Sequence, residues 1–152
     1  MRRGQDKMRI ALGCDHAAVE MAGMIKNFLQ EKGAEVVCFI PPLGESVDYP
    51  VYARLAANAV LKDGCKGAVL ICGTGAGISM AANKVPGIRA ACCSEAVTAR
   101  LSKEHNNANV ICFGARIVGA ETAKAIVDAW LDAEFQGDRH LTRVNMIEDT
   151  ND

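Results

Sequence analysis

Residues 67–79 are Gly67-Ala68-Val69-Leu70-Ile71-Cys72-Gly73-Thr74-Gly75-Ala76-Gly77-Ile78-Ser79. An apolar run leads into a loop rich in glycine, and the loop leads into residues 78–83, whose pattern is helical. This order predicts a buried strand, a tight turn and a helix. Cys72 then lies at the carboxyl end of the strand, where the loop begins.

The glycine loop favours a particular chemistry. Glycines allow several backbone N–H groups to converge on one anion, and the dipole of the following helix adds partial positive charge. The same field favours a thiolate over a thiol at Cys72, which becomes a candidate base or nucleophile. Thr74 lies inside the loop, where its hydroxyl can hold an oxyanion or a sugar oxygen. The alternatives are a buried structural cysteine and a locally capping threonine, and the glycines favour the functional interpretation of Cys72.

Beyond this segment, strands and helices alternate along the whole chain. Strands are predicted at residues 9–13, 35–40, 67–71, 88–93 and 108–113. Helices are predicted at residues 17–32, 48–62, 78–83, 94–103 and 121–133, with Ser94 as the cap of the fourth. The strands are near-continuous apolar runs, which is typical of a parallel sheet that helices cover on both faces. The predicted fold class is therefore α/β with a five-stranded parallel sheet.

Length and composition limit the classes of function. The 152 residues fit a single domain over residues 8–152, after a loose extension, residues 1–7, that lacks the apolar run of a signal peptide. A net charge of -1 and 5% aromatic residues argue against nucleic acid, and no apolar stretch is long enough to span a membrane. The seven cysteines are odd in number and include no Cys-x-x-Cys pair, so neither a disulfide framework nor a zinc site is indicated. A reducing cytoplasm is the expected setting.

Ligands bind parallel sheets of this kind outside the carboxyl ends of the strands. Asp15-His16 follows the first strand, and a carboxylate beside an imidazole suits contacts to sugar hydroxyls and phosphate. Equally, Asp15 can cap the next helix while His16 is solvated. A nucleotide site is disfavoured, because Ile78 stands where the G-x-G-x-x-G fingerprint needs its last glycine and the loop lacks the Lys-Ser/Thr ending of a P-loop.

Two further segments carry titratable or cationic side chains. His105 precedes a run of asparagines before the last strand and is either an acid–base group or part of a polar turn. Arg139, His140 and Arg143 lie in a basic carboxyl-terminal tail, and Arg116 follows the last strand. Arginine forks match phosphate oxygens, although a solvated basic stretch is the simpler interpretation of so few charges. The tail follows the last long helix, so it can reach the cleft of a neighbouring subunit.

Together these groups suggest the isomerisation of a small phosphorylated sugar. A thiolate base, an acid–base histidine and phosphate-binding arginines are present, and no cofactor-binding element is visible. Aldose–ketose isomerisation needs little more, because one group opens the ring, a base moves a proton between C1 and C2, and donors stabilise the enediolate.

From about Met8 to Ile147 the chain resembles the type B ribose-5-phosphate isomerases, a sugar-phosphate isomerase family that includes the galactose-6-phosphate isomerase subunits and allose-6-phosphate isomerases. The resemblance rests on the segments Gly13–Ala17, Ser46–Pro50, Ile71–Ser79, Ala81–Ala90, His105–Val110 and Gly137–His140. It implies a Rossmann-like three-layer α/β/α sandwich, a homodimer or dimer of dimers with sites between subunits, and no metal or coenzyme.

The resemblance also implies a role for each candidate residue. In the chemical steps, Cys72 would be the enediolate base, Thr74 would stabilise the intermediate, His105 would assist ring opening and Asp15 would contact the sugar near its ring oxygen. Sugar oxygens would be bound by Asn106 and by the backbone of Gly73, Gly75 and Gly77. The phosphate would be bound by His16, Arg116, Arg139, His140 and Arg143. Some relatives use a glutamate on the helix after the loop instead of cysteine, and the early part of that helix carries none here.

The leading hypothesis is a metal-independent isomerase that interconverts ribose 5-phosphate and ribulose 5-phosphate through a cis-enediolate. A six-carbon substrate, allose 6-phosphate or galactose 6-phosphate, is the close alternative. A nucleotide-dependent oxidoreductase and a noncatalytic sugar-phosphate sensor are more distant ones. The chain departs from the family pattern at Phe39-Ile40-Pro41-Pro42-Leu43-Gly44-Glu45, a loop at the ligand end that can alter the pocket wall and the substrate preference.

Overall fold

The computed structural model of the chain describes residues 6–149. Of the extension predicted for residues 1–7, residues 1–5 lie outside the described range. The strands are β1 (Arg9–Cys14), β2 (Glu35–Phe39), β3 (Gly67–Cys72), β4 (Ala90–Cys92) and β5 (Val110–Gly114). The helices are α1 (Val19–Glu31), α2 (Tyr49–Lys62), α3 (Ala76–Asn83), α4 (Ala96–Asn106), α5 (Ala120–Asp132) and α6 (Arg139–Glu148).

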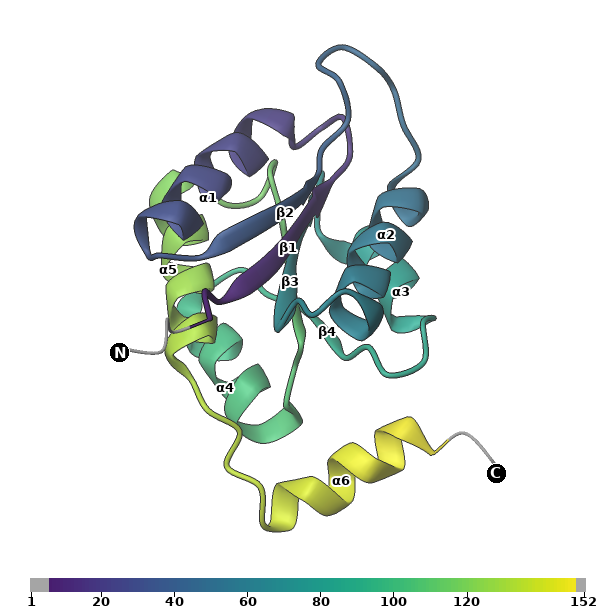
Figure 1. Ribbon diagram of the computed structural model, residues 1–152, viewed down its shortest axis with the longest axis vertical. Helices are drawn as coiled ribbons and strands as arrows, with labels where there is room; N and C mark the ends of the chain where they lie inside the picture. Colours follow the sequence, from purple (N-terminus) through teal and green to yellow (C-terminus); the bar gives the residue numbers. More distant parts are fainter. Residues whose placement is uncertain (1–5, 150–152) are drawn as a thin grey trace.

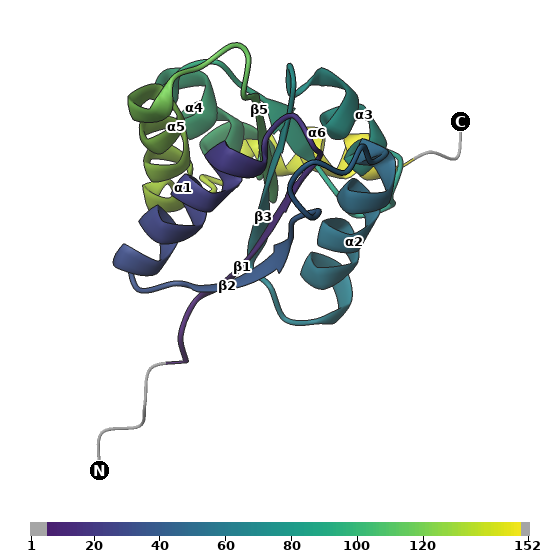
Figure 2. The same cartoon turned by 90° about the horizontal axis from the view of Figure 1, so that it is seen from above.

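The strands form one parallel sheet in the order β2-β1-β3-β5-β4, which confirms the predicted fold class. Helices α1, α4 and α5 cover one face and α2 and α3 cover the other, so the molecule has three layers (Figures 1 and 2). Within residues 6–149, no helix combines the length and the apolar character that crossing a bilayer requires.

The core packs differently on the two faces of the sheet, with large side chains on one face and small ones on the other. On the α1–α5 face, Trp130 packs so closely over Gly67 that a Cβ there would lie 2.6 Å from the indole ring. The indole N–H donates to the Ala108 carbonyl at 2.9 Å, so its burial leaves no unpaired donor. On the other face, α2 presents a row of buried alanines to the sheet, Ala53, Ala56, Ala57 and Ala59. Small residues bring α2 close to the sheet.

Three local predictions differ from the structure. Ser94 is not the cap of α4, because the carboxylate of Glu95 accepts the Thr98 N–H at 3.0 Å and so satisfies a free donor of the first turn. The same helix continues to Asn106, three residues beyond its predicted end. The basic tail, in turn, contains α6, a helix that the sequence analysis did not predict.

The strand order determines where a ligand can bind. The chain leaves β1 towards β2 on one side and leaves β3 towards β4 on the other, so the carboxyl ends of β1 and β3 flank a topological switch point. Asp15 follows β1, and its N–H donates to the carbonyl of Ile71 in β3 at 3.2 Å. Asp15 and Cys72 therefore both lie at this switch point.

Candidate active site

The glycine loop directs a backbone donor at the Cys72 sulfur. Gly75 has φ +85°, a left-handed conformation that favours glycine, and its N–H lies 3.2 Å from the Sγ of Cys72. A Cβ on Gly75 would lie 2.8 Å from the backbone of Phe113, so no other residue fits without displacing β5. The first turn of α3 begins at the next residue. A negative charge on the sulfur would therefore meet both a direct donor and the positive end of a helix.

Thr74 and Arg116 border this loop. The Thr74 hydroxyl accepts the Ala76 N–H at 3.2 Å, which is the local capping contact considered from the sequence. Its own O–H proton has no acceptor among residues 6–149, so the hydroxyl can still donate to a ligand. The Arg116 N–H donates to the Gly73 carbonyl at 3.0 Å, and a Cβ on Gly73 would lie 3.3 Å from the guanidinium. The guanidinium of Arg116 thus places a permanent positive charge against the loop.

Asp15 and His16 follow β1, on the other side of the switch point from the glycine loop. Asp15 is only 7% exposed, and its Oδ1 accepts the Ala17 N–H at 3.0 Å. The Nδ1 of exposed His16 lies 3.1 Å from both the N–H and the carbonyl of Val47. When Nδ1 accepts from the Val47 N–H, the proton of a neutral ring is on Nε2 and available to a ligand. The loop before α2 thereby orients a residue of the site.

Tyr49 lies against the glycine loop at Gly77, although the sequence analysis gave it no role. A Cβ on Gly77 would lie 2.7 Å from the phenol ring and 2.9 Å from its oxygen, so Gly77 makes room for the tyrosine against the first turn of α3. The phenol O–H has no hydrogen-bond partner among the described residues. Tyr49 lies in Ser46–Pro50, one of the segments that resemble the isomerase family, and this position is the sequence feature that could have identified it.

The remaining candidates lie at the other end of the sheet. His105 is in the last turn of α4, and its ring stacks on that of His140 with centroids 4.4 Å apart and planes within 10°. Burial lowers the pKa of His140 below its ordinary 6.5, and the positive charges of His105, Arg139 and Arg143 lower it further. Arg139 and Arg143 are exposed and one helical turn apart on α6, so both forks project from the same face.

Asn106 is exposed beside a groove of about 630 Å³ that lies between the end of α6 and residues 83–91. Helices that connect parallel strands run antiparallel to them, so the carboxyl end of α4 lies at the amino edge of the sheet. Figure 1 shows α6 at that edge, away from the loop before α2. The predicted site residues therefore form two clusters. We call them the carboxyl-edge cluster, Asp15, His16, Cys72, Gly73, Thr74, Gly75, Gly77 and Arg116, and the α4–α6 cluster, His105, Asn106, Arg139, His140 and Arg143.

All seven cysteines are free thiols in the structure. Burial raises the pKa of Cys14 and of Cys93 to about 12, and it raises the pKa of fully buried Cys112 well above the ordinary 9.0. Such thiols stay protonated and act as small apolar groups. Among residues 6–149, no three or more histidine, cysteine or acidic side chains are grouped so that they could hold a metal ion.

The chain is similar to known sugar-phosphate isomerases. The model of the ribose/galactose isomerase family matches residues 10–147. Ribose-5-phosphate isomerase B of Escherichia coli is 50% identical over 91% of this chain and 93% of its own length. D-erythrulose-4-phosphate isomerase of Pectobacterium atrosepticum is 43% identical over 92% of this chain and 93% of its own.

A solved structure of Clostridium thermocellum ribose-5-phosphate isomerase B superposes with a TM-score of 0.91 at 50% identity. The match covers 93% of this chain and 95% of that one. Sequence and fold thus correspond over nearly the whole length of the chain. The chain belongs to the ribose/galactose isomerase family.

Proposed function

We propose that this protein interconverts ribose 5-phosphate and ribulose 5-phosphate, with Cys72 as the base. The observation that carries the assignment is the Gly75 N–H directed at the Cys72 sulfur, at the switch point and beside Arg116. A thiolate held there can take a proton from carbon, and the adjacent donors can hold the oxygen anion that results.

The reaction proceeds without net oxidation. The thiolate takes the proton from C2 of the open-chain aldose, the released electron pair forms the C1–C2 double bond, and the carbonyl oxygen at C1 becomes the enediolate oxygen. Thr74 and the N–H groups of the loop stabilise that oxygen. Transfer of the O2 proton to O1 and return of the carbon-bound proton to C1 give the ketose. His105 assists the preceding ring opening as an acid, and Asp15 contacts the sugar near the ring oxygen.

The complete site requires two copies of the chain. Within one copy, the carboxyl-edge cluster holds the base, whereas the α4–α6 cluster at the far end of the sheet holds His105 and the arginine forks. A symmetric dimer that places the α6 of one copy beside the glycine loop of the other unites the two clusters, twice per dimer. Arg139 and Arg143 then bind the phosphate together with the partner's own Arg116 and His16. The same reasoning holds for a dimer of dimers.

The number of carbons in the sugar substrate is a separate part of the proposal. Relatives named for ribose 5-phosphate and for D-erythrulose 4-phosphate both match nearly the whole chain, so the family motif alone does not select a length. The segment Phe39–Glu45 borders the ligand end, with Leu43 85% exposed, and a change in this wall favours or excludes a longer sugar. Six-carbon aldose phosphates are therefore the second class of substrate to test. The seven free thiols support a reducing, cytoplasmic setting.

The test is an NMR assay of ribose 5-phosphate with purified protein in D2O and EDTA, run beside Cys72→Ala. We expect the native protein to form ribulose 5-phosphate and Cys72→Ala to lower kcat by about a hundredfold or more, with a thermal midpoint close to native. Cys38→Ala, which removes a thiol from edge strand β2, should leave kcat unchanged. Binding of the sugar phosphate without turnover would instead support the sensor hypothesis, and full activity of Cys72→Ala would exclude the thiolate base.

A further inference from the structure

Helix α6 makes a ring contact with the rest of the chain near its first residue and an ion pair near its last. At its first turn, His140 stacks on His105 of α4 at 4.4 Å. At its last turn, the Glu148 carboxylate lies 2.6 Å from the Nη1 of Arg89, which precedes β4. Between these contacts, the apolar side chains of Leu141, Met146 and Ile147 are about half exposed or more. Val144, in the middle of the helix, is buried at 6% exposed, so the position of α6 on a single chain depends on these two end contacts together with the packing of Val144.

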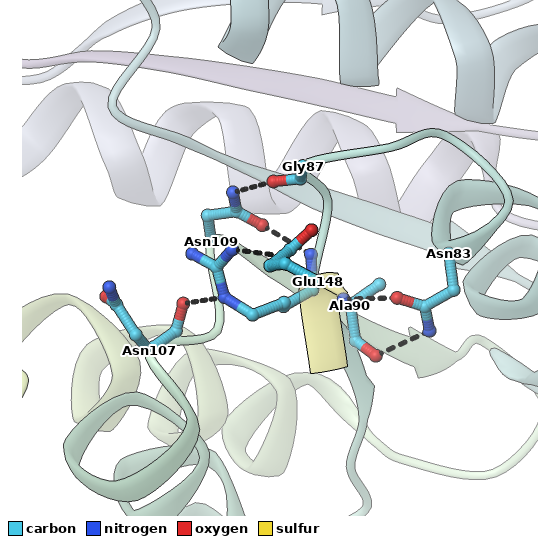
Figure 3. A network of polar contacts seen from close by, with 7 residues as sticks. Asn83, Gly87, Ala90, Asn107, Asn109 and Glu148 are labelled. Atoms are coloured by element: carbon cyan, nitrogen blue, oxygen red, sulfur yellow. Dashed lines mark hydrogen bonds and ion pairs between the residues drawn. The ribbon is translucent and has the colours of Figure 1, made fainter. Parts of the chain in front are cut away.

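Arg89 makes a second bond with the same guanidinium. Its Nε donates to the carbonyl of Asn107 at 3.0 Å, while its Nη1 donates to Glu148 (Figure 3). Asn107 is the left-handed residue, φ +49°, that ends α4 directly after His105 and Asn106. One planar, rigid fork thus joins the turn that carries the acid–base histidine to the helix that carries the phosphate-binding arginines.

The backbone of Arg89 is itself fixed. The Arg89 N–H donates to the Oδ1 of Asn109 at 2.8 Å, and the amide of that asparagine donates to the Gly87 carbonyl at 2.9 Å. The Asn83 side chain binds both the N–H and the carbonyl of Ala90 (Figure 3). The Arg89 side chain is only 16% exposed. Because the guanidinium is sheltered and its backbone is anchored on both sides, the bonds to Asn107 and Glu148 set a defined position for α6.

We propose that Arg89 is a positioning residue for the reaction, because it holds α6 and the His105–Asn106 turn in one fixed geometry for the sugar phosphate. The inference rests on the proposed function, since it assigns substrate contacts to the α4–α6 cluster. In this role Arg89 acts through α6 and through the His105–Asn106 turn. Loss of its bond to Glu148 displaces Arg139 and Arg143, and loss of its bond to Asn107 displaces His105.

The experiment compares Glu148→Ala with the matched control Glu121→Ala. Glu121 is also a helical carboxylate in an ion pair, with Lys124 at 3.7 Å, but it lies on α5 and is 93% exposed. We expect Glu148→Ala to raise KM for ribose 5-phosphate and the inhibition constant of inorganic phosphate by the same factor, about threefold to tenfold, with kcat within about twofold of native. Hydrogen–deuterium exchange of residues 139–148 should become faster in Glu148→Ala alone.

Arg89→Lys tests the second bond. Lysine keeps the charge but has no rigid fork for two acceptors, so KM should rise as in Glu148→Ala and kcat should also fall several-fold. The double variant should be no worse in KM than Arg89→Lys, because both changes break the same contact. Additive effects in the double variant would overturn the inference, as would KM, phosphate inhibition and exchange rates in Glu148→Ala that match those of Glu121→Ala.

Different results would exclude the proposed isomerase function and the positioning role of Arg89. If the native protein does not convert ribose 5-phosphate, the proposed function fails, and with it the catalytic consequence assigned to Arg89. If the native protein converts it and Arg139→Ala raises KM while Glu148→Ala does not, the function stands and the positioning role is excluded.

Discussion

Gly75 connects the backbone of the loop to the sulfur of Cys72. Its left-handed φ of +85° turns its N–H towards the thiol, and β5 leaves no space for a side chain at this position. The sequence predicted a loop at this place because glycines follow an apolar strand. It did not indicate which N–H meets the sulfur, because that depends on how Phe113 of the neighbouring strand packs against the loop.

Gly75→Ala should therefore reduce both stability and turnover. The left-handed φ and the approach to Phe113 together should lower the free energy of unfolding by about 1–3 kcal/mol, and displacement of the N–H should lower kcat more than it changes KM. Gly23→Ala is the matched control, since no atom lies within 4 Å of the added Cβ in α1, and it should raise stability by up to about 1 kcal/mol. Urea unfolding and steady-state kinetics measure both. Equal stability of the two variants would contradict the assigned strain.

At the scale of the element, α6 is the feature that sequence patterns did not predict. Its residues are mostly polar, so it has no long apolar run, although Leu141, Val144 and Ile147 recur at helical spacing and make the helix amphipathic. The charges of Arg139, His140 and Arg143 are the more prominent feature of this segment, and they suggest a basic tail. The five alternating strand–helix pairs were predictable because each carries a longer apolar run, whereas the cap at Glu95 was missed because it depends on side-chain geometry.

The docking of α6 on α4 should weaken at acidic pH. The pKa of His140 in the folded chain lies below its ordinary 6.5, so the unfolded chain takes up the proton first. The contribution of this group is therefore fully present above about pH 6.5 and is lost as the pH falls towards the folded-state pKa. Thermal midpoints measured from about pH 7.5 down to about pH 5 should fall less steeply in His140→Gln than in the native protein. Parallel curves for the two proteins would contradict this linkage, and His16→Gln, at an exposed histidine, serves as the control.

At the scale of the whole molecule, the strand order separates the candidate residues into two clusters. Sequence motifs identified the residue types, but they could not show which share an edge of the sheet, because that depends on the order β2-β1-β3-β5-β4 and on the direction of α4. A single chain holds Cys72 and Arg116 at one edge of the sheet, and His105, Arg139 and Arg143 at the other. The family resemblance implied sites between subunits, and the separation of the clusters supports the same proposal.

The most direct test of this composite site is complementation between two inactive variants. Cys72→Ala and His105→Ala are each expected to be nearly inactive alone. When the two are unfolded together and refolded, a mixed dimer contains one site with both native residues, and random pairing should restore about a quarter of native activity. No activity above the sum of the separate variants, in a mixture shown to contain mixed dimers, would mean that Cys72 and His105 act within one chain and would contradict a site shared between subunits.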